Sequence, residues 1–301
     1  MKFSTEAIAE IERIIMADFA NQLTEEKVKA SDLEKALRTS IQEIARNSFG
    51  KMLTLLDERN YGVDANCQCG AKAKRVSKRE TQVLGIFGWS PYRRSYYNCD
   101  KCGQNWVALD ETEHLRAGQA TPLMSSLLAL SGITVSFEEA REQIGQYLAV
   151  NVSANTIRKE TQLIGEKQAM RESEWIAKSQ DLDHLQERER LCEEPKRMYG
   201  SIDGAFAPVE DEWREMKTVC WYQAGLRYQS EKLHAKDIAY YSSFEKAEPF
   251  GELLWGTAVH HRADQAKELI FVCDGAAWIW KQVEKLFPKA VQIVDWYHAN
   301  Q

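Results

Sequence analysis

Hydrophobic positions in the first 60 residues recur at the three-to-four-residue spacing of amphipathic helices. One apolar stripe covers residues 8–19 and a second covers residues 33–49, with Ser31 or Asp32 as a suitable helix start for the second. The pattern predicts two helices in residues 1–60. We interpret them as a packing or oligomerisation arm, with a direct DNA contact as the alternative.

The periodicity changes in residues 61–110, where glycine, cysteine and β-forming residues replace the helical spacing. Residues 82–87 and 92–97 are predicted to form short strands around a turn at residues 88–91. This stretch is therefore expected to be a small β-rich domain.

Helical spacing returns in residues 111–167, which we predict to be a separate domain. Its last two helices cover residues 137–148 and 154–166 and are joined by a short break. A charged helical linker, residues 168–197, follows, and Pro195 is the predicted domain boundary.

Residues 198–301 alternate between apolar strands and helical segments, a pattern typical of an α/β domain. The predicted strands are residues 198–203, 216–224, 238–242, 269–274 and 291–295. The complete chain is thus expected to be a multidomain α+β protein.

The composition fits such an arrangement, because 301 residues with 44% hydrophobic and 28% charged side chains can form two or three folded units. No apolar run has the ~18 to 20 residues of a membrane span, and the N-terminus lacks a signal-peptide pattern. We expect a cytoplasmic protein that does not bind membranes. Its seven cysteines are then expected to be reduced or to bind metal.

Four of the cysteines form two close pairs about thirty residues apart. Cys67 and Cys69 are followed by Gly70, and Cys99 and Cys102 are followed by a second glycine. Four thiolates suit a closed tetrahedral site, and a glycine permits the tight turn that each pair needs. The spacing predicts a structural Zn²⁺ ion in a zinc β-ribbon; free reduced thiols are the alternative.

The net charge of −6 conceals a basic segment at residues 67–109, which holds eight Lys or Arg and two acidic residues. Its cations alternate with aromatic residues, so they could contact phosphate while the rings pack. A solvated charged face is the alternative. The predicted DNA-binding residues of this segment are Lys74, Arg75, Lys78, Arg79, Arg93 and Arg94.

The two predicted helices at residues 137–148 and 154–166 have the outline of a helix-turn-helix, with Ser136 and Ser153 as N-caps. The second helix begins with small polar and then basic residues, which suits a major groove. Any two amphipathic helices can imitate this outline. The predicted DNA-binding residues here are Ser153, Asn155, Thr156, Arg158 and Lys159.

Asp203 and Asp274 each follow an apolar strand, precede a glycine and lie 71 residues apart. If the two strands are neighbours, the carboxylates could share Mg²⁺ (or Mn²⁺) and catalyse phosphodiester chemistry. A strand-ending Asp-Gly is otherwise only a turn signal. An apolar stripe within residues 276–287 predicts that a helix docks on the sheet directly after Asp274.

From about residue 60 to residue 301 the chain resembles the ISKra-type bacterial insertion-sequence transposases, relatives of the Mutator-like group. The resemblance rests on the two cysteine pairs, the helix-turn-helix outline and four segments in order: Asp203-Gly-Ala, Trp213-Arg-Glu-Met-Lys217, Asp274-Gly-Ala-Ala-Trp278-Ile-Trp280 and Asp295-Trp-Tyr-His298-Ala.

The resemblance implies that residues 198–301 form part of an RNase H-like catalytic domain. Asp203 and Asp274 match the first two acids of an Asp-Asp-Glu triad, and Asp295 and His298 match an accessory motif. The family's glutamate lies beyond that motif, so no residue here matches it, and Glu284 is expected to face solvent. The resemblance also implies binding to the terminal inverted repeats of double-stranded DNA as a homo-oligomer.

Three functions follow as hypotheses. The first is a transposase that cleaves and joins DNA in its full-length form and is inactive or very weak as this chain alone. The second is a DNA-binding fragment that represses or competes with transposition. The third is a gene fragment without a role.

Overall fold

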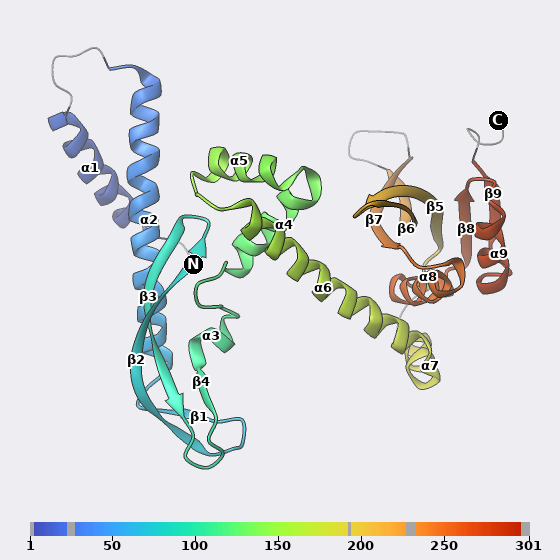
Figure 1. Cartoon of the computed structure of the whole chain (residues 1–301), viewed down its shortest axis with the longest axis horizontal. Helices are drawn as coiled ribbons and strands as arrows, with labels where there is room; N and C mark the ends of the chain where they lie inside the picture. Colours follow the sequence, from blue (N-terminus) through green and yellow to red (C-terminus); the bar gives the residue numbers. More distant parts are fainter. Residues whose placement is uncertain (1–2, 23–27, 192–193, 227–232, 296–301) are drawn as a thin grey trace. The chain divides into compact units, whose positions relative to one another are not determined.

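The computed structural model describes residues 3–22, 28–191, 194–226 and 233–295. The chain divides into two compact units, Met1–Ile164 and Gly165–Gln301. It is a mixed α+β protein, as predicted, with one sheet in each unit (Figure 1). None of the described helices is long and apolar enough to cross a membrane.

The first unit begins with the two predicted helices, α1 (Thr5–Gln22) and α2 (Ala30–Asn60). The predicted start of the second helix was slightly wrong. Ser31 and Asp32 lie inside the first turn of α2, whose N-cap is Lys29 without a side-chain hydrogen bond.

A four-stranded antiparallel sheet follows in the order β1-β2-β3-β4. The predicted turn at residues 88–91 is wrong: the long β2–β3 hairpin turns at residues 86–87, and Gly85 pairs with Gly88. Gly88 has φ +102, a conformation that favours glycine, and the chain is already in β3 from this residue on. The strands are β1 (Asp64–Asn66), β2 (Lys72–Gly85), β3 (Gly88–Asn98) and β4 (Asn105–Val107).

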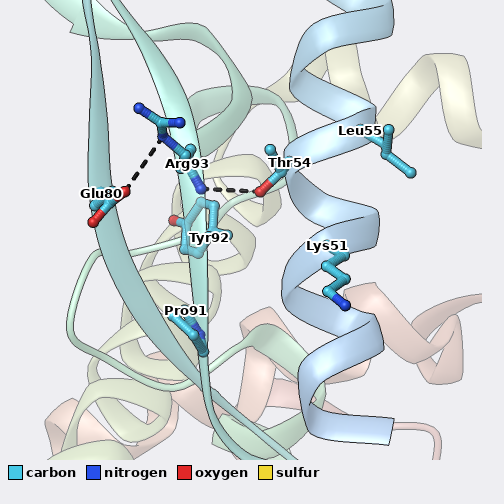
Figure 2. Close-up of a pocket in the computed structure, with 7 residues that line it drawn as sticks. All are labelled: Lys51, Thr54, Leu55, Glu80, Pro91, Tyr92 and Arg93. Carbon is cyan, nitrogen blue, oxygen red and sulfur yellow. Dashed lines mark hydrogen bonds and ion pairs between the residues drawn. The ribbon is translucent and has the colours of Figure 1, made fainter. Parts of the chain in front are cut away.

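Helix α2 lies along β3 and provides acceptors for its backbone N–H groups. Thr54 Oγ1 accepts a hydrogen bond from the Arg93 amide at 3.0 Å (Figure 2). The buried carboxylate of Asp57 accepts from the Ser95 amide at 3.0 and 3.1 Å and from the Ser95 hydroxyl at 2.7 Å. The helix therefore satisfies donors of an edge that would otherwise need another strand.

The helices after the sheet are α3 (Ala108–Thr112), α4 (Pro122–Thr134), α5 (Phe137–Leu148) and α6 (Ala154–Ser179). The predicted bounds of α5 are confirmed; Ser136 and Glu139 form a capping box at its start, and Ala149 ends it in the left-handed conformation. Helix α6 continues beyond its predicted end at residue 166 and is followed by α7 (Leu182–Leu191). Side chains of α4, α5, α6 and β2 form one core, which contains Leu84, Met124, Leu128, Ala140, Ile144 and Ile157.

The second unit contains a five-stranded sheet in the order β7-β6-β5-β8-β9. Strands β5, β6 and β7 are antiparallel neighbours, whereas β8 runs parallel to β5 and β9 runs parallel to β8. The strands are β5 (Arg197–Val209), β6 (Glu212–Leu226), β7 (Leu233–Ser243), β8 (Glu268–Cys273) and β9 (Val291–Val294).

Helices α8 (Ala247–His261) and α9 (Ala277–Leu286) bury one face of this sheet, and the short 3₁₀ helix η1 (Ala263–Gln265) follows α8. The predicted apolar stripe on α9 is confirmed at Ile279 and Val283, both fully buried, and Glu284 is exposed as predicted. Trp221 on β6 is also fully buried and donates its indole N–H to Thr257 on α8 at 2.9 Å.

Candidate functional sites

The four predicted cysteine ligands lie together in the first unit. The Sγ atoms of Cys67, Cys69, Cys99 and Cys102 are all within 4.8 Å of one another. The distances are 3.5 Å from Cys67 to Cys102 and 3.7 Å from Cys69 to Cys99, too long for disulfide bonds. Thiolates ~2.3 Å from a tetrahedral Zn²⁺ lie about 3.8 Å apart, so the cluster could hold a metal such as zinc.

Glycine-containing turns shape both halves of the cluster. The amide of Gly70 donates to the Cys67 carbonyl at 2.9 Å, and the amide of Gly103 donates to the Cys99 carbonyl at 2.7 Å. Both glycines have positive φ, +81 and +73, where a side chain would strain the turn. The glycine after each cysteine pair was therefore a correct signal.

Crowding of the thiols opposes their simultaneous ionisation. The Cys69 amide lowers the pKa of Cys67, but burial and the three neighbouring thiols together raise it to about 12. The amide of Cys102, followed by that of Lys101, lowers the pKa of Cys99 to about 7. A divalent cation would remove this conflict, because it stabilises all four thiolates at once.

The basic β2–β3 hairpin presents part of the predicted DNA surface. Arg79 stacks on the ring of Tyr96, with 3.3 Å between its Cζ and the ring centroid. Lys78 pairs with Glu58 at 2.6 Å, and Arg93, whose side chain is 58% exposed, lies 3.4 Å from Glu80. Lys74, Arg79 and Arg93 are exposed, whereas Arg75 and Lys78 are half-buried.

Arg94 is a correction to the predicted DNA surface. Its guanidinium pairs with Asp110, and both side chains are only 14% exposed. Tyr92 donates its hydroxyl to the same aspartate at 3.0 Å. Arg94 therefore stabilises the packing between β3 and α3, because Asp110 neutralises its charge inside the unit.

The N-terminal turns of α6 carry the other predicted DNA-binding residues. Ser153 caps the helix by accepting a hydrogen bond from the Thr156 amide at 3.0 Å. Arg158 donates to the side chains of Asn155 at 2.8 Å and Gln162 at 3.1 Å. Ser153, Asn155, Arg158 and Lys159 are exposed and Thr156 is half-buried, while Ile157 is fully buried on the opposite side of the helix.

Asp203 lies on β5, and Asp274 directly follows the neighbouring strand β8. The parallel pairing of β5 and β8 places Gly200 opposite Phe271, which is 71 residues later in the sequence. The same 71 residues separate Asp203 from Asp274. The Ile202 amide donates a hydrogen bond to Sγ of Cys273 at 3.2 Å. The two strands are therefore still in contact at the residues that directly precede Asp203 and Asp274. Burial raises the pKa of Cys273 to about 11, and Asp274 and Asp203 both contribute to the rise. Asp203 and Asp274 thus directly follow two residues that are in contact, Ile202 and Cys273.

The expectation that Asp203 ends its strand is wrong. Strand β5 continues to Val209 because it remains paired with β6, while β8 ends at Cys273. Asp203 is exposed and accepts a hydrogen bond from the Gly204 amide at 2.7 Å. Asp274 is half-buried and accepts from the Ala276 amide at 2.9 Å at the start of α9.

The predicted accessory residues are only partly described. The amide of Asp295 donates to the Cys273 carbonyl at 2.8 Å, which places Asp295 at the end of β8 beside Asp274. His298 lies outside the described residues. Within residues 3–22, 28–191, 194–226 and 233–295, only the cysteine cluster brings three or more potential metal ligands together. Of the expected magnesium site, the described part of the chain therefore contains the two predicted aspartates, Asp203 and Asp274, without a third ligand grouped with them.

A buried lysine behind Asp203, paired with a half-buried glutamate, was not predicted from the sequence. Lys217 on β6 is 7% exposed and pairs with Glu215 at 2.7 Å. Its Nζ lies 5.4 Å from the Trp278 ring centroid, and a Cβ on Gly204 would lie 2.7 Å from a Glu215 oxygen. The available signal was a lysine at an inward position of an alternating apolar strand.

A cavity of about 530 Å³ between α2 and β3 was also not predicted. Figure 2 shows Lys51 and Leu55 on the helix and Arg93 and Glu80 on the hairpin. Its remaining lining residues are Thr54, Pro91 and Tyr92.

The chain belongs to the uncharacterised protein family UPF0236, whose model matches residues 23–301. A comparison with curated proteins finds no match.

Proposed function

We propose that the chain is a DNA-binding protein of the transposase class, related to the ISKra-type insertion-sequence transposases. The observation that carries the catalytic part of the proposal is the placement of Asp203 on β5 and of Asp274 directly after the parallel neighbouring strand β8. The mixed sheet, with an antiparallel hairpin on one side of β5 and parallel strands on the other, fits the RNase H-like domain that the resemblance implies.

Asp203 and Asp274 would hold Mg²⁺ or Mn²⁺. The bound ion would supply activation of a water or a 3′-hydroxyl and stabilisation of the leaving oxygen of a phosphodiester. The hydrogen bonds from Gly204 to Asp203 and from Ala276 to Asp274 fix one oxygen of each group. Asp295 would act from the end of β8, where its backbone is anchored on Cys273.

The first unit would bind the DNA. Its zinc β-ribbon would fix the hairpin that exposes Arg79 and Arg93, and cations of this kind bind phosphates of any sequence. The exposed polar side of α6, with Asn155 and Arg158, would read base edges as the second helix of a helix-turn-helix. Double-stranded terminal repeats are the proposed target, bound as a homo-oligomer.

A second function, DNA binding without strand cleavage, is favoured by one observation. Among the described residues, no third histidine, cysteine or carboxylate joins Asp203 and Asp274 to form a ligand group. Two carboxylates hold Mg²⁺ weakly, because other oxygen ligands must then come from water or substrate. In this form the protein would repress or compete with transposition.

Selection of bound duplexes from a random-sequence library tests the DNA-binding proposal with the complete chain. Arg158→Ala should relax the selected sequence, because it removes a side chain proposed to contact bases. Arg79→Ala and Arg93→Ala should weaken binding to all duplexes and reduce its salt dependence.

Arg141→Ala is the matched control for Arg158→Ala. Arg141 is an exposed arginine on the neighbouring helix α5 and pairs with Glu138 at 2.8 Å. An unchanged selection by this variant is expected. Absence of any enriched sequence, or binding that ignores salt, would reject DNA recognition in both proposed functions.

A further inference from the structure

The second sheet has a hollow on the face opposite α8 and α9. Alternation along the strands places Ile202, Val219 and Trp221 in the buried core and turns their neighbours to the other side. Those neighbours line a cavity of about 440 Å³. They are Ser201, Asp203, Ala205, Thr218, Cys220 and Tyr222, together with Ala235, Ile238 and Tyr240 of β7.

Strand register arranges the lining in two rows. Ser201, Cys220 and Tyr240 are paired across β5, β6 and β7. Asp203 and Thr218 begin the adjacent row, which ends at Ser242 on β7. Two strand spacings, about 10 Å, therefore separate β5, which carries Asp203, from β7, which carries Tyr240.

The aromatic side offers flat rings and hydroxyl groups. Tyr240 is a large ring on the edge strand β7 and is 67% exposed. Tyr222 stacks on Tyr199 with 5.2 Å between ring centroids and an interplanar angle of 9°, which holds its ring in a fixed orientation. Ser201 Oγ lies 3.5 Å from the Tyr222 hydroxyl. Rings on an open sheet face are a common platform for unpaired bases.

We propose that this hollow binds the base of an unpaired nucleotide, with Tyr240 as its stacking ring and the attached phosphate on the Asp203 side. The inference rests on the proposed function, because it places a DNA strand end beside Asp203, the member of the candidate acid pair that lines the hollow. The volume lies within the range of ~300 to 1,000 Å³ that is usual for small-ligand sites.

Charge and chemistry select a base for the aromatic side. The Asp203 carboxylate repels a phosphate that is not accompanied by a cation, so a phosphate bound there would need a divalent cation beside Asp203. The uncharged hydroxyls and rings on the other side suit the edge and the faces of a base. A purely apolar partner would desolvate the tyrosine hydroxyls of this side without offering them hydrogen bonds.

Photocrosslinking tests the inference on the complete chain. A short single-stranded oligothymidylate with one 5-iodouracil is irradiated with the protein in Mg²⁺, and the crosslinked peptide is identified by mass spectrometry. We expect crosslinks within β7 at Tyr240. Tyr240→Ala should remove these crosslinks and weaken the binding of this oligonucleotide at least about fivefold, which is the lower end of the effect expected when one base loses its stacking ring.

Two further variants separate stacking from structure. Tyr240→Phe retains the ring and should retain the crosslink, and Phe206→Ala should change nothing. Phe206 is 68% exposed on β5 and faces the opposite side of the strand from Asp203. It is therefore an aromatic control of equal exposure.

The outcomes distinguish the two proposals. Duplex selection that succeeds while crosslinks avoid β7, or persist in Tyr240→Ala, overturns the nucleotide site and leaves the proposed function intact. Failure of both the duplex selection and the crosslinking rejects both. A hollow occupied by a second copy of the chain would give no crosslink in β7 and would also overturn the inference.

Discussion

The backbone amide of Ile202 donates a hydrogen bond to the thiol sulfur of Cys273 at 3.2 Å. The two residues belong to neighbouring parallel strands, and each directly precedes an aspartate of the candidate pair. This contact between a backbone amide and a buried side chain thus helps to fix the register of β5 and β8, and with it the relative positions of Asp203 and Asp274. The acid pair depends on the sheet more than on the loops around it.

Zinc removal should unfold the sheet of the first unit. Four neighbouring thiols stabilise β1–β4 when a cation binds them and repel one another when they ionise without it. We expect about one zinc ion per chain by metal analysis and loss of that zinc in Cys99→Ser. The thermal transition of the first unit should fall sharply in the same variant.

Cys220→Ser is the control for the zinc prediction. Cys220 is a half-buried cysteine in the sheet of the second unit and is not one of the four clustered thiols. Full zinc content is expected in this variant. Zinc retained by Cys99→Ser would contradict the assignment of that residue as a ligand.

Substitution of Gly50 should separate α2 from β3. A Cβ at this position would lie 2.0 Å from the carbonyl oxygen of Pro91, and backbone cannot yield as a side chain can. Gly50→Ala should therefore destabilise the first unit by about 3 kcal/mol in urea unfolding.

Gly145→Ala provides the opposite case within the same unit. Gly145 is inside helix α5, and apart from the adjacent backbone of that helix no described atom lies within 4 Å of the added Cβ. Stability should increase by up to about 1 kcal/mol, because alanine is the better helix former. Equal effects of the two substitutions would show that α2 does not pack on Pro91 as described.

The second unit should lose stability as the solution becomes acidic. Burial, followed by the charge of His260, lowers the pKa of His261 from 6.5 to about 4, and the ring lies 2.6 Å from the Tyr241 hydroxyl. Below pH 6.5 the unfolded chain binds a proton at His261 that the folded chain resists until about pH 4. The contribution of His261 to the free energy of unfolding is thus complete above pH 6.5 and is lost as the pH falls towards 4.

Unfolding of His261→Gln and the parent chain at several pH values measures this contribution. After allowance for partial exposure we expect it to be about 2 kcal/mol, and the pH dependence should weaken by that amount in the variant. His184→Gln on α7 is the control and should follow the parent chain. Parallel curves for His261→Gln and the parent would contradict the prediction.

Local signals in the sequence predicted much of the fold. Helix α5 has its predicted bounds because Ser136 and Glu139 cap it through contacts three residues apart. The cysteine cluster was also predictable, since a short spacing and a glycine determine each half. The five strands of the second unit were found from apolar runs, although their ends were not.

The errors came from partners that are distant in the sequence. The charge of Arg94 is neutralised by Asp110 in the next helix, which basic spacing alone does not reveal. Strand β5 continues past Asp203 because β6 pairs with it as far as Val209. The inward orientation of Lys217 likewise becomes clear only when β6 is placed against Gly204 and Trp278.

Iron-directed cleavage tests the acid pair most directly. Fe²⁺ bound in place of Mg²⁺ produces hydroxyl radicals, with ascorbate and peroxide, that cut the backbone close to the ion. We predict cuts beside residues 203 and 274, suppressed by excess Mg²⁺ and lost in Asp203→Asn, whereas Glu284→Gln on the exposed side of α9 retains them. Cuts that avoid both positions, or that persist in Asp203→Asn, would contradict a shared metal site at these aspartates.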